Sequence, residues 1–148
     1  MNIDELHKMW DADAKIDEVN LDDSSIKTAS LHSKYLELYS LGKLRLKKKE
    51  LKKAVLKKDL WLYYNGKMTK AEMDKHDWKY DPFDGLSKPM KSDMEKFYST
   101  DSELLELELL LEYDKTYVET CKEILDNIKW RSQTIKNIIT WRQFQSGN

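Results

Sequence analysis

The sequence predicts an all-α protein, with a helical N-terminal domain that contains a basic helix and a long C-terminal helical region. Charged residues make up 36% of the 148 residues, and hydrophobic residues make up 40%, a composition typical of long, well-solvated helices. Only four glycines and two prolines occur, too few for a β-sandwich rich in turns. We expect a DNA-binding domain over residues 1–100 and an oligomerisation region over residues 101–148.

Two helices are predicted in the first half of the chain. Ser24 and Ser25 are expected to cap the first helix, with Gly42 as its weak point or end. The second begins near Lys43 and stops at Asn65-Gly66, a typical helix-terminating pair. Its apolar face is expected to be buried, and consists of Leu44, Leu51, Val55 and Leu62.

Capping signals predict the shorter elements that follow. Thr69 to Glu72 fits a capping box for a short helix through Trp78. Residues 80–89 gather both prolines and a glycine, and predict a break. Two further stretches, Ser92 to Glu95 and Thr100 to Glu103, also fit capping boxes.

The C-terminal stretch predicts one long helix from about residue 102 to residue 144. Its length would be roughly 65 Å at about 1.5 Å per residue, too long for a chain of this size to cover alone. Apolar residues recur along it in alternating steps of three and four, so we expect part of the stripe to pack on sister subunits. An ordinary bundle helix with a break is the alternative. The residues predicted to hold the oligomer together are Ile124, Ile128, Ile135 and Ile138.

Positive charge is concentrated in one segment of a chain whose net charge is only −1. Nine Lys or Arg and a single acid, Glu50, lie between Lys43 and Lys58. On a helix, several of these cations share a face with Trp61, and lysines so placed repel one another. Folding alone gives no reason to gather them. The predicted DNA-binding residues are Lys43, Lys47, Lys53, Lys57, Lys58 and Trp61.

A polyanion would explain this cluster, because each phosphate that a lysine neutralises releases a condensed counterion. Trp61, Tyr63 and Tyr64 at the end of the lysine row would form a stacking platform for unpaired bases, which favours single-stranded nucleic acid over a duplex. Two alternatives stay open. The lysines could be an ordinary solvated helix face with the aromatic residues in the core, or they could pair with an acidic band such as residues 101–114 in a coiled-coil scaffold.

Enzymatic classes find little support in the sequence. The three histidines lie in different segments, and a single cysteine excludes the familiar zinc spacings. Glycine-rich phosphate loops are absent. His76 beside Asp74 and Asp77 is read as solvent-facing rather than as a metal site, and Cys121 as a small buried hydrophobe. We therefore expect no enzymatic activity, no metal and no cofactor. Without a long apolar run or a basic leader, the chain is expected to be soluble and intracellular.

Scattered short motifs give the chain a resemblance to a known family. In order, they are Ser33-Lys34-Tyr35-Leu36, Lys52-Lys53, Leu56-Lys57, Tyr63-Tyr64-Asn65-Gly66 and Lys91-Ser92-Asp93-Met94, and then Ile135-Lys136, Ile138, Arg142, Phe144 and Gly147. In order, spacing and total length they resemble the UvsY recombination mediators of T-even-like tailed phages.

This resemblance implies a noncatalytic protein of the host cell cytoplasm that binds single-stranded DNA. It implies assembly into a ring-shaped homo-oligomer, a hexamer or heptamer, through the C-terminal region. It also implies two protein partners, the RecA-like recombinase and the single-strand-binding protein of the phage, with the mediator promoting recombinase loading. One DNA-contacting basic residue of the family matches Lys57. The second falls on Lys58 if a gap is allowed and on Asp59 if it is not, and the loop around Pro82 has no clear counterpart in the family.

Overall fold

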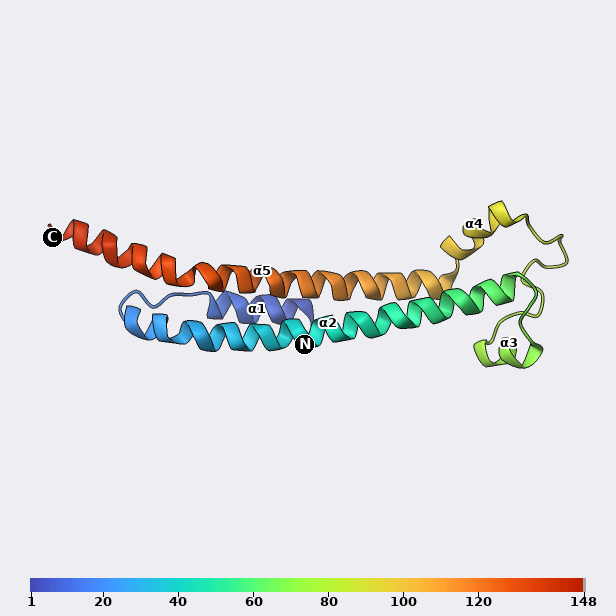
Figure 1. The fold of residues 1–148 in the computed structure, drawn as a ribbon, viewed down its shortest axis with the longest axis horizontal. Helices are drawn as coiled ribbons and strands as arrows, with labels where there is room; N and C mark the ends of the chain where they lie inside the picture. Colours follow the sequence, from blue (N-terminus) through green and yellow to red (C-terminus); the bar gives the residue numbers. More distant parts are fainter. Residues whose placement is uncertain (148) are drawn as a thin grey trace. The chain divides into compact units, whose positions relative to one another are not determined.

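The computed structural model describes residues 1–147 and is built of helices, with no strand among these residues. The all-α prediction is therefore confirmed. Two long helices dominate the chain, and shorter helices lie before and between them (Figure 1). The elements are α1 (Ile3–Asp13), α2 (Leu21–Tyr64), α3 (Lys70–His76), the 3-10 helix η1 (Lys91–Asp93), α4 (Met94–Ser99) and α5 (Ser102–Gln145).

The chain divides into two compact units, and both long helices contribute to each of them. The first unit contains Met1–Arg45 together with the chain from Asp114 onward, and the second contains Leu46–Tyr113. The predicted division at residue 101 falls just before the start of α5. Its assignment of DNA binding to one side and assembly to the other stays a prediction.

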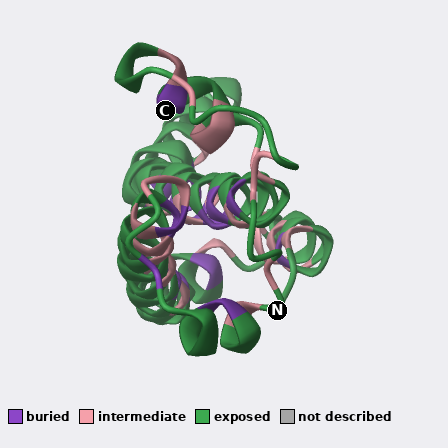
Figure 2. Cartoon of the chain, turned by 90° about the vertical axis from the view of Figure 1, so that its right-hand side faces the viewer, coloured by how far each residue is buried: buried purple, intermediate pink, exposed green. Residues whose placement is uncertain are grey.

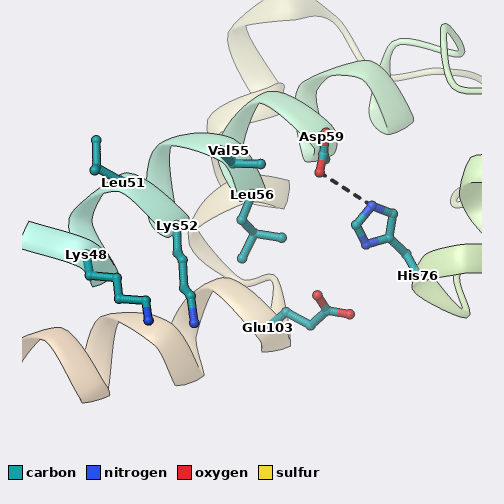
Figure 3. A pocket seen from close by; sticks show the side chains of 8 residues that line it. All are labelled: Lys48, Leu51, Lys52, Val55, Leu56, Asp59, His76 and Glu103. Carbon is teal, nitrogen blue, oxygen red and sulfur yellow. Dashed lines mark ion pairs between the residues drawn. The ribbon is translucent and has the colours of Figure 1, made fainter. Parts of the chain in front are cut away.

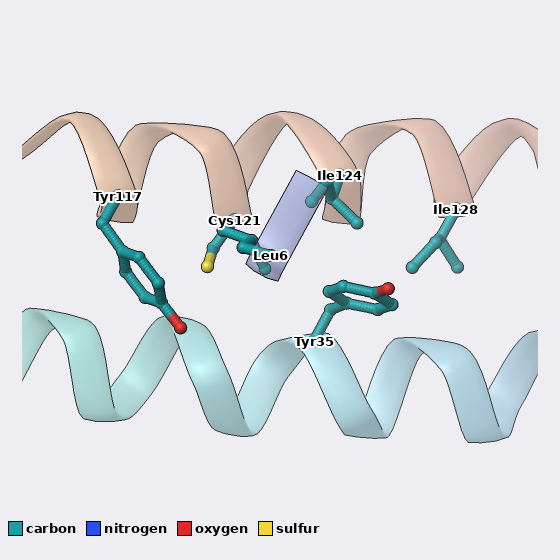
Figure 4. Packing of buried hydrophobic residues seen from close by; sticks show 6 residues of the cluster. All are labelled: Leu6, Tyr35, Tyr117, Cys121, Ile124 and Ile128. Carbon is teal, nitrogen blue, oxygen red and sulfur yellow. The ribbon is translucent and has the colours of Figure 1, made fainter. Parts of the chain in front are cut away.

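The core of the first unit forms where α1 lies against α2 and α5 (Figure 4). Tyr35 of α2 is fully buried, and the ring of Trp10 meets it edge-on at 5.4 Å between centroids. The alternating three- and four-residue spacing on α5 turns one side of that helix toward this core. The buried cluster consists of Leu6, Tyr35, Tyr117, Cys121, Ile124 and Ile128.

A partly buried polar network stabilises the connection between α1 and α2 in the first unit. Arg131 of α5 is buried and donates to the backbone carbonyls of Ala14 and Ser24, each at 3.4 Å. Asp13 accepts hydrogen bonds from Lys34 at 2.6 Å and from the Tyr35 hydroxyl at 2.8 Å. Burial acts to raise the pKa of Asp13, but these hydrogen bonds and the charges of Lys34 and Arg131 outweigh it, so the pKa lies below its usual value.

The predicted cap at Ser24 and Ser25 is wrong, because α2 starts earlier, at Leu21. Ser24 is buried within the helix and exchanges hydrogen bonds with the backbone of Asp17, at 3.0 and 3.3 Å. Its hydroxyl therefore fixes the loop before the helix, a local role that Ser fills as readily as a cap.

The predicted weak point at Gly42 is also wrong, because α2 runs through it without interruption. Gly42 is buried, and a Cβ atom placed on it would lie 3.1 Å from the Tyr117 ring and 3.2 Å from the Val118 side chain. This glycine allows α2 and α5 to approach each other closely inside the first unit.

Helix ends in the second unit follow the sequence signals in part. Gly66, at φ 69°, ends α2 as predicted, and Thr69 caps α3 by accepting from the Glu72 amide. However, α3 ends at His76, short of Trp78, and Ser92 caps neither η1 nor α4. The box predicted at Thr100 is displaced by one residue, because the side chain of Asp101 accepts from the Leu104 amide at the start of α5.

An aromatic cluster stabilises the second unit. Tyr64 contacts Tyr63. The centroid of the Tyr64 ring also lies between 5.7 and 6.1 Å from the ring centroids of Phe83, Phe97 and Tyr98. Tyr63 forms a buried cluster with Met68 and Met73, and Tyr64 packs against this cluster as well. Figure 2 shows buried residues as short stretches of the helices, with exposed residues over much of the remainder.

Candidate nucleic-acid interface

Two lysines near the end of α2 are exposed and are not paired with an acidic residue among residues 1–147. Lys57 and Lys58 lie in the second unit, and neither forms an ion pair or hydrogen bond with any residue from 1 to 147. Trp61 follows one turn later and is 45% exposed. The Lys67 ammonium lies 4.7 Å from the centroid of the Trp61 ring. Cations and an exposed aromatic ring are therefore neighbours at the end of this helix.

The other predicted DNA-binding lysines differ from one another in their surroundings. Lys53 is half-buried and its ammonium lies 2.9 Å from Glu108 of α5, so its charge is already compensated. Lys47 is exposed and only 3.9 Å from Glu50, a contact that solvent screens strongly. Lys43 belongs to the first unit, where its ammonium is 5.4 Å from the centroid of the Tyr39 ring.

Tyr63 and Tyr64 do not join Trp61 in an exposed platform, and that expectation is wrong. Tyr63 is 7% exposed and donates its hydroxyl hydrogen bond to the Lys79 carbonyl at 2.7 Å. Burial, together with the negative charge of Asp101, raises the pKa of Tyr64 to about 12. Both rings belong to the core, so any stacking at this end of α2 depends on Trp61.

Most of the apolar face predicted to be buried is exposed instead. Leu44, Leu51 and Val55 are 68%, 58% and 61% exposed, whereas Leu62 is half-buried against the cluster of Tyr63, Met68 and Met73. The side of α2 that packs inside the second unit carries Lys53, Leu56 and Leu60, of which Leu60 is fully buried. Lysine stems can cover apolar surface while the charged head reaches a carboxylate, which is how Lys53 occupies this side.

A cavity of about 470 Å³ opens beside the exposed aliphatic residues (Figure 3). Leu51, Val55 and Leu56 line it, with Lys48 and Lys52 at one side. At the other side both acids are engaged. Asp59 lies 3.4 Å from His76, His76 stacks on Trp78 at 4.1 Å, and the Trp78 indole donates to Glu103 at 2.9 Å.

The acidic, histidine and cysteine residues do not gather into a metal-binding group. Residues 1–147 contain no group of three or more His, Cys, Asp or Glu that could hold a metal ion. Asp74 accepts a hydrogen bond from the Tyr80 hydroxyl at 2.7 Å. Cys121 is buried, and burial raises the pKa of its thiol, which disfavours the reactive thiolate. Within the same residues, no helix combines the length and apolar content needed to cross a membrane.

The isoleucines predicted to form the oligomer lie at different depths of the first unit. Ile124 and Ile128 are buried in the core of their own chain, Ile135 is also buried, and Ile138 is half-buried. Their role in assembly stays a prediction. Sequence reasoning gave no role to Trp130 and Trp141, which are among the large apolar residues exposed on the same helix.

Comparison with known proteins decides the family. The model of the family described as "Recombination, repair and ssDNA binding protein UvsY" matches residues 9–148. The chain belongs to the UvsY family. The resemblance found in the short motifs is therefore confirmed over nearly the whole chain.

A relative and two crystal structures extend the match. The recombination protein uvsY of Enterobacteria phage T4 is 28% identical over 149 residues, covering 99% of both sequences. Two crystal structures of the bacteriophage T4 recombination mediator protein UvsY superpose with TM-scores of 0.80 and 0.81, at 27% and 28% identity. They cover 99% and 95% of this chain, and 98% of each T4 chain. The UvsY family thus shares this all-helical fold.

Proposed function

We propose that this member of the UvsY family binds single-stranded DNA through the exposed cations of α2. The observation that carries the proposal is the pair Lys57 and Lys58, which are exposed and have no partner among residues 1–147. A lysine without a partner releases condensed counterions when it binds a phosphate, whereas a lysine in an ion pair is already neutralised. Lys43 and Lys47 extend the contact, and Lys53 joins it only when its pair with Glu108 opens.

The further role that we propose is that of a noncatalytic recombination mediator in the host cell cytoplasm. In this role the chain promotes loading of a RecA-like recombinase onto DNA covered by single-strand-binding protein. The T4 relative is itself named a recombination mediator protein, which supports the proposal. We infer a homo-oligomeric ring, a hexamer or heptamer, that holds several basic surfaces at fixed spacing, so that avidity exceeds the affinity of one copy.

Assembly through the C-terminal half of α5 is part of the proposal. Large apolar side chains are exposed there, and Trp141 and Phe144 are 59% and 71% exposed. Contiguous exposed apolar surface marks interaction sites in soluble proteins. Ile135 and Ile138 lie on the same stretch of α5. In this assembly they support the exposed apolar surface from its buried side.

A second candidate function is a scaffold whose basic band pairs with acidic bands. One contact favours it, namely the pair between Lys53 and Glu108, which joins the two bands inside one chain. A protein with this second function would not bind DNA.

Fluorescence anisotropy of a labelled oligonucleotide, titrated with protein at several salt concentrations, separates the two functions. The mediator binds single strands in preference to duplex, and its affinity falls steeply with salt. Absence of binding at low salt would leave only the scaffold. Recombinase loading is tested by the lag before filaments form on a strand coated with single-strand-binding protein, and a lag that the chain fails to shorten contradicts the mediator role.

A further inference from the structure

A small cavity lies in the second unit where the basic surface of α2 ends. Its volume is about 260 Å³. Trp61 lines this cavity and lies one helical turn after Lys57 and Lys58. A DNA strand bound to these lysines would therefore run next to the opening of the cavity. The residues that line the cavity are Trp61, Asn65, Lys91, Met94, Glu95 and Tyr98.

The lining combines one aromatic ring, an apolar wall and a polar rim. Met94 is buried and provides the apolar wall. Lys91 and Glu95 are exposed and place a donor and an acceptor at the edge. The Asn65 side-chain amide donates one hydrogen bond to the Trp61 carbonyl, at 2.8 Å, and its oxygen can act as an acceptor. A flat ligand with apolar faces and a mixed polar edge fits this arrangement.

Tyr98 completes the wall of the cavity, and its ring lies 5.8 Å from that of Tyr64 between centroids. Its hydroxyl has no accessible surface, so it does not face the space that a ligand would occupy. The wall that a ligand meets is therefore mainly aromatic and apolar.

A nucleobase matches these features better than an aliphatic side chain does. Bases stack on aromatic rings whatever their sequence, and their edges carry both donors and acceptors. The Lys67 ammonium lies over one face of the Trp61 ring, 4.7 Å from its centroid, so a base would stack on the opposite face. A base paired within a duplex cannot enter such a cavity, because its edge is occupied and its faces are stacked.

We propose that this cavity, the Trp61 pocket, holds one unpaired nucleobase of the strand whose phosphates lie on Lys57 and Lys58. This inference rests on the proposed function, which it deepens by assigning the preference for single strands to a specific site. It also separates two contributions to binding. The lysines supply the salt-dependent part, and the Trp61 pocket supplies a part that depends on bases and not on salt.

The test compares an oligothymidine with a strand of equal length in which every base is replaced by an abasic site. Wild-type protein should bind the base-bearing strand more tightly. Trp61→Ala should weaken that binding by about 5- to 150-fold, the loss expected for one stacked base. The same variant should leave both the affinity for the abasic strand and the salt slope unchanged.

Two further variants keep the test independent of folding. Trp61→Phe retains an aromatic ring, and should recover part of the affinity lost in Trp61→Ala, again only on the base-bearing strand. Tyr80→Ala removes a different exposed aromatic ring of the second unit, and should change neither affinity.

Three outcomes would overturn the assignment. Equal wild-type affinity for the two strands would show that bases are not bound. Equal losses of Trp61→Ala on both strands would show that Trp61 acts through the fold. Failure of wild-type protein to bind either strand would remove the proposed function, and the Trp61 pocket with it.

Discussion

Neutralising Lys57 and Lys58, two unpaired lysines of α2, gives the sharpest test of how the chain binds DNA. In the double variant Lys57→Gln and Lys58→Gln, each protomer loses two phosphate contacts, since both side chains are exposed and without partners among residues 1–147. At about 0.7 per contact, the slope of log affinity against log salt should flatten by about 1.4 for each protomer engaged. The loss of affinity relative to wild type should then be about 25-fold larger at 0.1 M salt than at 1 M.

The matched control removes the same charge elsewhere. Lys115 and Lys122 are exposed on α5, and Lys115→Gln with Lys122→Gln changes the net charge of the chain equally. That variant should leave the slope unaltered. Lys53→Gln is a second comparison, since its partner Glu108 has already compensated the charge, and the slope should change by much less than 0.7.

Anisotropy titrations of an oligothymidine at four or more salt concentrations measure these slopes. Circular dichroism of each variant establishes that the helices are intact. An unchanged slope in the Lys57 and Lys58 double variant would remove both residues from the DNA-binding surface. An equal flattening in the α5 control would attribute the effect to net charge and not to a site.

Three other predictions concern stability and assembly. Because the pKa of Asp13 lies below its ordinary 3.8 in the folded chain, its contribution is complete above about pH 4 and is lost as pH falls through the folded value. Asp13→Asn should therefore cost more in urea unfolding at pH 7 than at pH 2, and an equal cost at both would contradict this. Gly42→Leu should destabilise by about 1–3 kcal/mol, because Tyr117 leaves no room for a side chain, and an unchanged thermal midpoint would argue against that close approach. Trp141→Ser with Phe144→Ser should give folded monomers by native mass spectrometry, and an intact assembly would exclude this surface from the interface.

Elements with local signals could be predicted from the sequence, and the long helices are the clearest case. The absence of glycine and proline between residues 90 and 146 predicted α5 to within one residue at its C-terminal end. Thr69 was recognised as a cap because its partner lies three residues away. Gly42 was misread because the reason for a glycine there lies on α5, which no local pattern reveals.

The choice of the buried face of α2 failed for a related reason. Hydrophobicity favoured Leu51 and Val55, yet the packed side includes Lys53, whose charge meets Glu108 more than fifty positions later. A lysine that buries its stem is indistinguishable in sequence from one that is fully solvated. Similarly, Trp61 and Tyr63 are two residues apart, and only the fold separates the exposed ring from the buried one.

The Trp61 pocket lay outside what the sequence could predict. Met94 and Tyr98 reach it from α4, across a connection that contains both prolines of the chain. Neither residue carries a recognisable motif. The neighbouring lysine row directed attention to this end of α2, but not to a cavity there.

The polar network around Arg131 bears on how the protein is made. Its guanidinium reaches the Ala14 and Ser24 carbonyls, which the ribosome adds more than a hundred residues earlier. The core around Tyr35 likewise cannot form until Tyr117 and Ile128 have been synthesised. The second unit, Leu46–Tyr113, is one uninterrupted stretch of chain. During translation the lysine-bearing part can therefore fold first, and the nascent N-terminus acquires its packing only when the last helix emerges.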